Sequence, residues 1–186
     1  MKRLVLLGLT AGLLMSTGGC LSRAAKEALL SPKGFAVPTA MESVRQHSYS
    51  KVQFQAFSNL GITTMPANMN EVLHTSLVTK IATLKPQKAI LDPSANRVVL
   101  VRGRYIYYEE AGSILDQAFG PFEEIIAIVE LVDQPTGKVI ASGYCVGRTG
   151  TTRLQGSRRK AEGMAKAIIE LIRKSCRTPA GPIDRN

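Results

Sequence analysis

The stretch Glu124–Val146, EIIAIVELVDQPTGKVIASGYCV, decides the fold, because two apolar segments lie on either side of a short polar turn. Glu124–Val132 and Val139–Val146 are rich in β-branched residues, which favour strands. Between them, the Pro-Thr-Gly sequence at 135–137 has the chemistry of a tight turn. We therefore expect an antiparallel β-hairpin over these residues.

Further strand-like segments and two amphipathic segments flank this hairpin. Val98–Glu109 is a long strand-like segment, and Lys51–Phe57 alternates apolar and polar residues as a half-buried strand does. Apolar residues at helical spacing predict helices over 69–84 and 157–176. The short apolar segment Ala89–Leu91 is expected to complete a β-α-β unit with a right-handed crossover.

The order of these elements, β-α-β-β-β-β-α, predicts an α/β (α+β) two-layer sandwich. We expect a mixed sheet of about four or five strands, with both amphipathic helices on one face. This domain would cover residues 51–176. Residues 177–186 contain two prolines and a glycine and are expected to fray.

The N-terminus has the features of an export signal. Two basic residues precede Leu4–Met15, an uncharged and largely apolar run that is too short to span a bilayer as a helix. Small residues then lead to Cys20, as in the signal-peptidase site of bacterial lipoproteins. We expect residues 1–19 to be a signal peptide and Cys20 to carry the lipid. A plain secretory signal cut near Gly19 and an unprocessed anchor are the alternatives.

Several of these features together resemble a family. They are the candidate acylated cysteine, the strand pattern of Lys51–Phe57, and the hairpin Ile128–Ala141 with its D-x-x-T-G-K turn. The chain resembles small bacterial outer-membrane lipoproteins of uncharacterised function that share a TolB-amino-terminal-like α/β domain. The resemblance spans residues 51–176. It implies that fold, a place in the cell envelope and a scaffolding or assembly role, and it carries no catalytic residue over.

The same resemblance suggests where the anchored protein resides. In proteobacterial lipoproteins the absence of Asp after the lipidated cysteine favours the outer membrane, and here Leu21 follows Cys20. We expect an outer-membrane lipoprotein facing the periplasm, with the inner membrane and the cell surface as alternatives. Residues 20–50 are rich in hydroxyls, charges and helix breakers, and we expect the lipidated cysteine followed by a flexible tether.

A basic segment leads into the second predicted helix. The chain has 24 Lys and Arg against 14 Asp and Glu, a net charge of +10. Backbone N–H groups and the dipole at a helix N-terminus favour anions, so this segment predicts a binder of anionic envelope polymer or lipid headgroups. A solvated basic face is the alternative. The candidate residues are Arg148, Arg153, Arg158, Arg159 and Lys160.

Residues 110–122 link two predicted strands and carry large apolar side chains. Such side chains either fold back onto the core or contact a partner, so this loop is a candidate surface for a protein of the envelope. Acidic pairs at 109–110 and 123–124 flank the loop and, with Asp116, suggest a weaker Ca²⁺ site; strand-end charges guarding a loop are the alternative. The loop's apolar residues are Ile114, Leu115, Phe119 and Phe122.

The remaining reactive or aromatic residues do not form a catalytic set. Tyr105 and Tyr107 are expected to share a strand face and to pack in the sheet, so we expect no nucleic-acid partner. Cys145 and Cys176 are expected to stay unlinked, because strand and antiparallel helix would hold them about 20 Å apart. The sequence has no Ser/His/Asp set, HExxH motif or C-x-x-C motif. No cofactor and no metal are expected.

The sequence thus predicts a lipid-anchored periplasmic binding or assembly module that acts through protein partners in the cell envelope, without catalysis. The alternative is a binder of anionic polymer or lipid headgroups that uses the basic loop 148–160. A partner module should capture a defined envelope protein, whereas a polymer binder should sediment with cell wall or anionic vesicles in a salt-sensitive way.

Overall fold

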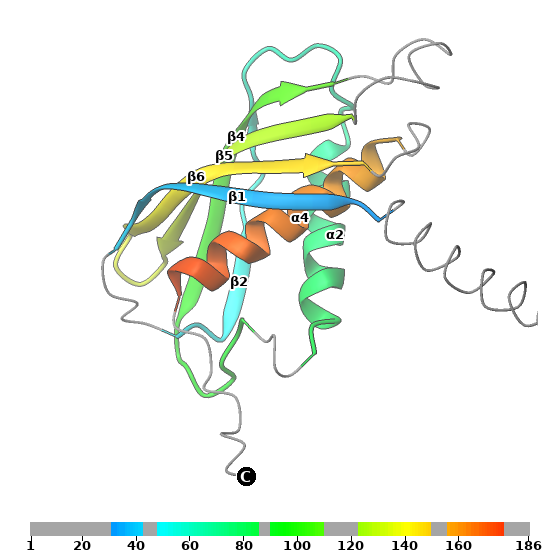
Figure 1. Ribbon diagram of the computed structural model, residues 1–186. Helices are drawn as coiled ribbons and strands as arrows, with labels where there is room; N and C mark the ends of the chain where they lie inside the picture. Colours follow the sequence, from blue (N-terminus) through cyan, green and yellow to red (C-terminus); the bar gives the residue numbers. More distant parts are fainter. Residues whose placement is uncertain (1–30, 43–47, 86–89, 110–122, 150–155, 177–186) are drawn as a thin grey trace, which may run out of the picture. The chain divides into compact units, whose positions relative to one another are not determined.

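The computed structural model describes residues 31–42, 48–85, 90–109, 123–149 and 156–176 (Figure 1). One sheet of six strands carries two helices on one of its faces, which is the predicted two-layer α+β class. The predicted signal sequence, Cys20 and the tail 177–186 lie outside the described residues. The elements in chain order are β1 (Lys33–Met41), β2 (Lys51–Phe54), β3 (Ser58–Asn59), α2 (Met69–Ala82), β4 (Val98–Tyr108), β5 (Glu124–Asp133), β6 (Lys138–Arg148) and α4 (Gly156–Ser175).

The central hairpin is confirmed. β5 and β6 pair antiparallel from Glu124 opposite Arg148 to Asp133 opposite Lys138. The carbonyl oxygen of Asp133 accepts from the backbone N–H of Gly137 at 2.8 Å, which closes the turn. Gly137 has a φ of 69°, a conformation that glycine adopts without the penalty of a side chain.

The β-α-β unit is also present, with a different second strand. β2 runs parallel to β4, from Lys51 opposite Val98 to Phe54 opposite Val101, and α2 lies between them in the chain. The prediction of a strand at Ala89–Leu91 is wrong for the part described, because Ile90 and Leu91 have no strand conformation. Ile90 instead packs into the core and is 1% exposed.

The prediction that residues 20–50 form only a tether is wrong for Lys33–Met41. This segment is β1, an edge strand that pairs antiparallel with β6, and it raises the number of strands above the expected four or five. Gly34 and Pro38, which disfavour a central strand, are accommodated here because an edge strand pairs on one side only. Three glycines, from β1, β6 and α4, let the helix approach the sheet closely: Gly34, Gly147 and Gly163.

The close approach of α4 to the sheet explains why glycine occupies position 163 of the helix and position 147 of β6. A Cβ on Gly163 would lie 2.5 Å from the carbonyl oxygen of Lys33, and one on Gly147 would lie 2.6 Å from that of Lys160. No substituent fits at either position without moving backbone. The core between helices and sheet contains Met164, Ile168 and Leu171 of α4 together with apolar side chains of β4 and β5.

A bulge in β4 changes the face on which one tyrosine lies. Tyr105 pairs with Ala127 and Tyr107 pairs with Ile126, so Ile106 is an extra residue. Tyr105 is fully buried, whereas Tyr107 is 45% exposed. The expectation that the two tyrosines share a face is therefore wrong, because the inserted residue reverses the alternation after Tyr105.

Candidate protein-binding face

The two helices that the structure describes, α2 and α4, both lie on the same side of the sheet, and we call the side without a described helix the open face. Three rows of side chains cross the strands there, each fixed by the pairing register. The aromatic row is Phe35, Val146, Ile126 and Tyr107; the mixed row is Val37, Tyr144, Ile128 and Arg104; the polar row is Ala40, Ser142, Glu130 and Arg102.

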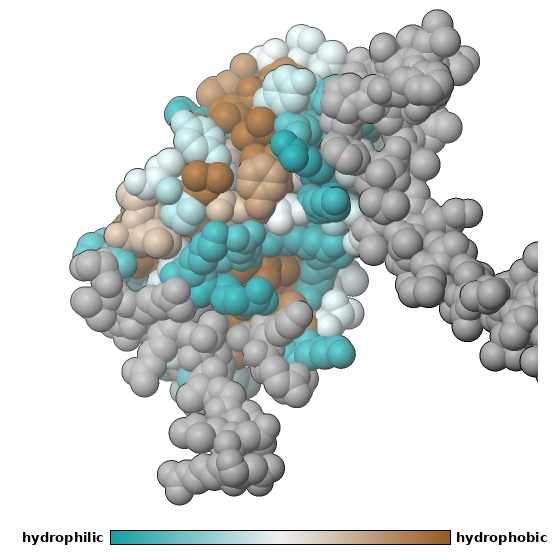
Figure 2. Space-filling view, viewed as in Figure 1, coloured by the Kyte–Doolittle hydropathy of each residue, from teal (hydrophilic) through white to brown (hydrophobic). Residues whose placement is uncertain are grey.

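The mixed row exposes large apolar side chains, and in the aromatic row Tyr107 is 45% exposed whereas Val146 is buried. Val37 is 51% exposed and Tyr144 is 42% exposed, and both lie in the outer half of the sheet. Figure 2 shows hydrophobic side chains gathered over the strands, with hydrophilic ones beside them. Contiguous apolar surface of this kind marks interaction sites on soluble domains. The open face is therefore the candidate functional surface.

The polar side chains of the polar row already have partners within the sheet. Arg102 Nε lies 2.7 Å from Glu130 Oε2 across the β4–β5 pair. The Ser142 hydroxyl lies 3.0 Å from that of Thr39. These side chains form a polar border on one side of the two rows that hold the apolar groups.

The mixed row ends at Arg104, which lines a cleft. The cleft has a volume of about 380 Å³ and lies where β2 ends and the chain leaves the sheet before β3. Its lining combines polar and apolar groups: Gln55, Ala56, Ser58, Arg102, Gly103, Arg104, Ile128 and Glu130. A partner on the open face would thus meet an apolar strip followed by a polar hollow.

The free edge of β1 does not offer a comparable surface. The N–H of Ala36 donates to Glu170 Oε2 at 3.2 Å, and Lys174 Nζ donates to the Ala36 carbonyl oxygen at 3.2 Å. Pro38 has no N–H to offer, and a bulge follows it. Together these features block the addition of another strand. The open face is therefore more accessible to a partner than this edge.

The predicted basic site is only partly described. Arg153 lies outside the described residues, as do Ile114, Leu115, Phe119 and Phe122 of the predicted partner loop. Arg148, Arg158, Arg159 and Lys160 are described, at the end of β6 and in the first turns of α4.

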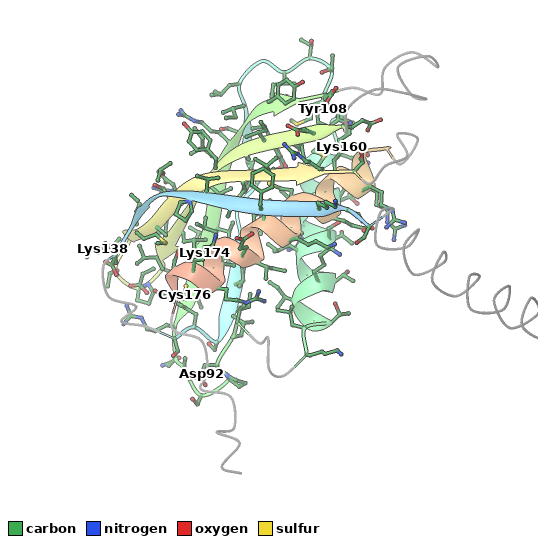
Figure 3. The ribbon with its side chains drawn as sticks, in the orientation of Figure 1. Asp92, Tyr108, Lys138, Lys160, Lys174 and Cys176 are labelled. Carbon is green, nitrogen blue, oxygen red and sulfur yellow. The ribbon has the colours of Figure 1, made fainter. Side chains whose placement is uncertain are left out.

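Lys160 is not a surface cation, which corrects its place in the predicted basic face. Its Nζ lies 3.0 Å from Glu123 Oε2, and both side chains are at most 2% exposed. The ammonium also donates to the carbonyl oxygen of Glu109 and lies 4.1 Å from the ring centroid of Tyr108 (Figure 3). A buried charge needs such partners, and this arrangement leaves it unavailable to an external anion.

The three described arginines of the basic site have acidic partners as well. Arg148 pairs with Glu124 on the neighbouring strand and lies over the ring of Phe35. Arg159 Nη1 lies 3.2 Å from Glu162 Oε2, and Arg158 Nε lies 3.7 Å from Glu162 Oε1. The four described cations of this segment therefore face three carboxylates, which leaves an excess of one positive charge.

The acidic residues beside the predicted partner loop do not assemble a metal site in the described ranges. Glu123 is held by Lys160, and Glu109 Oε2 accepts from the backbone N–H of Glu124 at 3.2 Å. Within the described residues, no three His, Cys, Asp or Glu side chains lie close enough to share a metal ion. Glu110 and Asp116 lie outside them.

A second, larger hollow lies between the two helices. It has a volume of about 470 Å³ and is lined mainly by hydroxyls and by charges of both signs: Asn68, Glu71, Val72, Thr75, Ser76, Thr79, Lys80, Arg158 and Glu162. No aromatic ring and no excess of one charge lines it, so its chemistry favours no particular ligand class.

Cys145 and Cys176 are buried thiols and form no disulfide with each other. Burial raises the pKa of the Cys145 thiol to about 12, so the group stays protonated at neutral pH. A reactive cysteine has the opposite character, a lowered pKa and access to solvent. Cys145 therefore acts as a small apolar residue beneath α4.

Comparisons with known proteins give distant likenesses only. No protein-family model matches the chain, and no curated protein matches it. Among solved structures it is similar to PelC from Paraburkholderia phytofirmans, described as a dodecamer, with 12% identity and a TM-score of 0.49 over 78% of this chain and 99% of that one.

Two further similar structures are a lipoprotein from Neisseria meningitidis and a DUF330 protein from Xanthomonas campestris. The first is 16% identical, with a TM-score of 0.35 over 68% of this chain and 99% of that one. The second is 14% identical, with a TM-score of 0.38 over 74% and 89%. These likenesses assign no family, and the TolB-like resemblance stays a prediction. Within the described ranges, no helix is both long and apolar enough to cross a membrane.

Sequence reasoning missed the open face, although a signal for it exists. β5 carries apolar residues on both of its faces. Ile126 and Ile128 lie on the open face, and Ala127 and Val129 lie on the face that packs against the helices. A sheet with one solvated face alternates apolar and polar residues instead. The departure from alternation points to a second surface that is not simply solvated.

Proposed function

We propose that this protein is a lipid-anchored binding or assembly module of the cell envelope, which acts through a protein partner and without catalysis. The observation that carries the proposal is the open face, where Val37 and Tyr144 expose apolar surface on a sheet whose other face is packed against helices. Cys20, at the end of an export signal, supports the lipid anchor. The absence of Asp at position 21 supports the outer membrane, where we place the protein facing the periplasm.

A protein partner fits this surface better than an anionic polymer does. Neutral aromatic and aliphatic side chains dominate two of its three rows, and interface cores are enriched in such residues. The basic segment 148–160 supports the polymer alternative less well, because its described cations have acidic partners. The partner loop 110–122 remains a second proposed contact.

Capture of partners from solubilised envelopes by the acylated full-length chain tests the proposal. We expect one defined envelope protein to be retained, and Tyr144→Ser to reduce its recovery by about tenfold, since a central interface aromatic contributes on the order of 1–2 kcal/mol. Val78→Ser is the matched control, because Val78 is 54% exposed on α2, away from the open face. Equal recovery with both variants would contradict the face; loss only with Phe119→Ser and Phe122→Ser would move the contact to the loop.

The anchor has a separate test. Cys20→Ala should abolish incorporation of labelled fatty acid and release the protein from membranes. Full retention of the variant in the detergent phase would contradict the lipid anchor and leave the open face unaffected.

A further inference from the structure

Arg104 differs from the other arginines that the structure describes. Arg102 and Arg148 each have a glutamate opposite them in the sheet, and Arg97 bonds to Asp133 at 2.5 Å. Arg158 and Arg159 share Glu162, and Arg173 also has an interaction. Among the described residues, the guanidinium of Arg104 has neither a hydrogen bond nor an ion pair nor a ring contact, and this side chain is exposed. One uncommitted guanidinium thus lies on the open face.

The register sets what surrounds this guanidinium. Arg104 lies opposite Ile128 on β5 and opposite Ser58 on β3. Gln55 lines the same cleft from the segment where the chain has left β2. The cleft therefore offers a guanidinium, an amide and a hydroxyl as hydrogen-bond donors beside an apolar wall.

The charge of the cleft limits the kind of anion that fits. Glu130 also lines the cleft, and its carboxylate is already balanced by Arg102. The net charge left over is that of Arg104, a single positive charge. A carboxylate matches one positive charge and binds a guanidinium through two parallel hydrogen bonds. A phosphate dianion would bring a second negative charge close to Glu130.

The apolar part of the mixed row leads directly to this cleft. Val37, Tyr144 and Ile128 lie on successive neighbouring strands, followed by Arg104 on the next. With strands about 4.8 Å apart, the row spans about 14 Å. A segment lying across the strands would place apolar side chains along the row and an acidic group at its end.

We propose that the Arg104 cleft binds a carboxylate of the protein partner, an acidic side chain or a C-terminus adjoining apolar residues that pack on Val37, Tyr144 and Ile128. This inference rests on the proposed function and specifies the chemistry of the partner. Arg104 sets the direction in which the partner segment crosses the sheet, and the apolar row supplies the buried area.

The first test uses a small probe and the full-length chain in detergent. N-acetyl-L-phenylalanine combines an aromatic ring with a carboxylate, and N-acetyl-L-phenylalaninamide is the same molecule without the charge. We expect the acid to shift the backbone amide resonances of Ser58, Arg104 and Ile128 at millimolar concentration, about tenfold more tightly than the amide. Arg104→Ala should remove this preference, Arg104→Lys should retain part of it, and Arg158→Ala on α4 should leave it unchanged. Equal binding of acid and amide, or an unchanged preference in Arg104→Ala, would overturn the proposal.

Three further experiments distinguish the carboxylate site from the proposed protein-binding role and from a lipid-binding site. An Arg104→Ala chain that keeps the envelope partner at full affinity would contradict the carboxylate site and leave the protein-binding role intact. A chain that captures no partner but still prefers the acid would contradict the role and leave the site intact. In the Cys20→Ala chain, phosphatidylglycerol vesicles that displace the acid from the cleft would assign it to lipid headgroups and overturn the proposal.

Discussion

Glu170 on α4 accepts a hydrogen bond from the backbone N–H of Ala36 on β1, at 3.2 Å and across 134 positions of the chain. Lys174 pairs with Glu170 at 2.6 Å and donates to the carbonyl oxygen of the same alanine. One helical turn earlier, Lys166 Nζ donates to the Pro32 carbonyl oxygen at 2.5 Å. Charged side chains one turn apart thus substitute for the missing neighbour of an edge strand.

Glu170→Ala should expose the backbone N–H of Ala36 on the β1 edge to solvent. We expect hydrogen exchange at the Ala36 amide to speed up by about tenfold, because the N–H loses a charged acceptor worth about 1–2 kcal/mol. Glu162→Ala is the control, since Glu162 pairs with arginines of its own helix. Unchanged exchange at Ala36 would show that the bond does not hold the strand.

The buried pair Lys160–Glu123 should be costly to break from one side. Lys160→Met leaves an uncompensated carboxylate in a site where both side chains are at most 2% exposed, so we expect a loss of about 3–5 kcal/mol in the free energy of unfolding. The double variant Lys160→Met/Glu123→Leu should recover most of it. Urea denaturation of the two single variants and the double variant measures the coupling, and additive losses would refute the pairing.

Gly163→Ala should destabilise the protein, against the trend for helices. Alanine is about 1 kcal/mol more favourable than glycine in a helix interior. Here the added Cβ would lie 2.5 Å from the carbonyl oxygen of Lys33 and 2.8 Å from the backbone nitrogen of Arg148. Overpacking of this kind costs about 1–3 kcal/mol, so we expect it to outweigh the gain in helix propensity and to lower the melting temperature. A higher melting temperature would mean that α4 does not approach the sheet so closely.

Asp133 should make the free energy of unfolding depend on pH in the acidic range. Burial alone raises the pKa of its carboxyl, but hydrogen bonds from Thr136 and Arg97 outweigh burial and leave the pKa below its ordinary value of 3.8. The group therefore contributes stability that is present above pH 3.8 and is lost as the pH falls through the folded-state pKa. Asp133→Asn should lower the unfolding free energy at pH 7 by about 1–3 kcal/mol and flatten its decline toward pH 3. Parallel pH profiles of the two proteins would contradict this.

The predictable parts of the fold are those with local signals. The β5–β6 hairpin follows from two apolar segments and the turn residues between them, and α4 follows from its apolar periodicity. β1 has no such signal, because Gly34 and Pro38 are typical of linkers. Its strand conformation depends on pairing with β6 and on Glu170 and Lys174, which are far along the chain.

The site was less predictable, for reasons of register and burial. Lys160 follows two arginines in the sequence, and only its contact with Glu123 distinguishes a buried cation from a solvated one. The mixed row joins residues from Val37 to Arg104, and it exists only once the pairing of four strands is known. The sequence therefore predicts a binding or assembly module without locating the face.

Site-specific photocrosslinking in living cells tests the central claim, that the open face binds a protein partner. A benzophenone side chain at position 144 should yield one discrete crosslinked protein, and one at position 78, on the exposed surface of α2, should yield none. The account predicts an adduct at 144 that is lost on introducing Arg104→Glu. Adducts of equal yield at both positions, or none at 144, would contradict it.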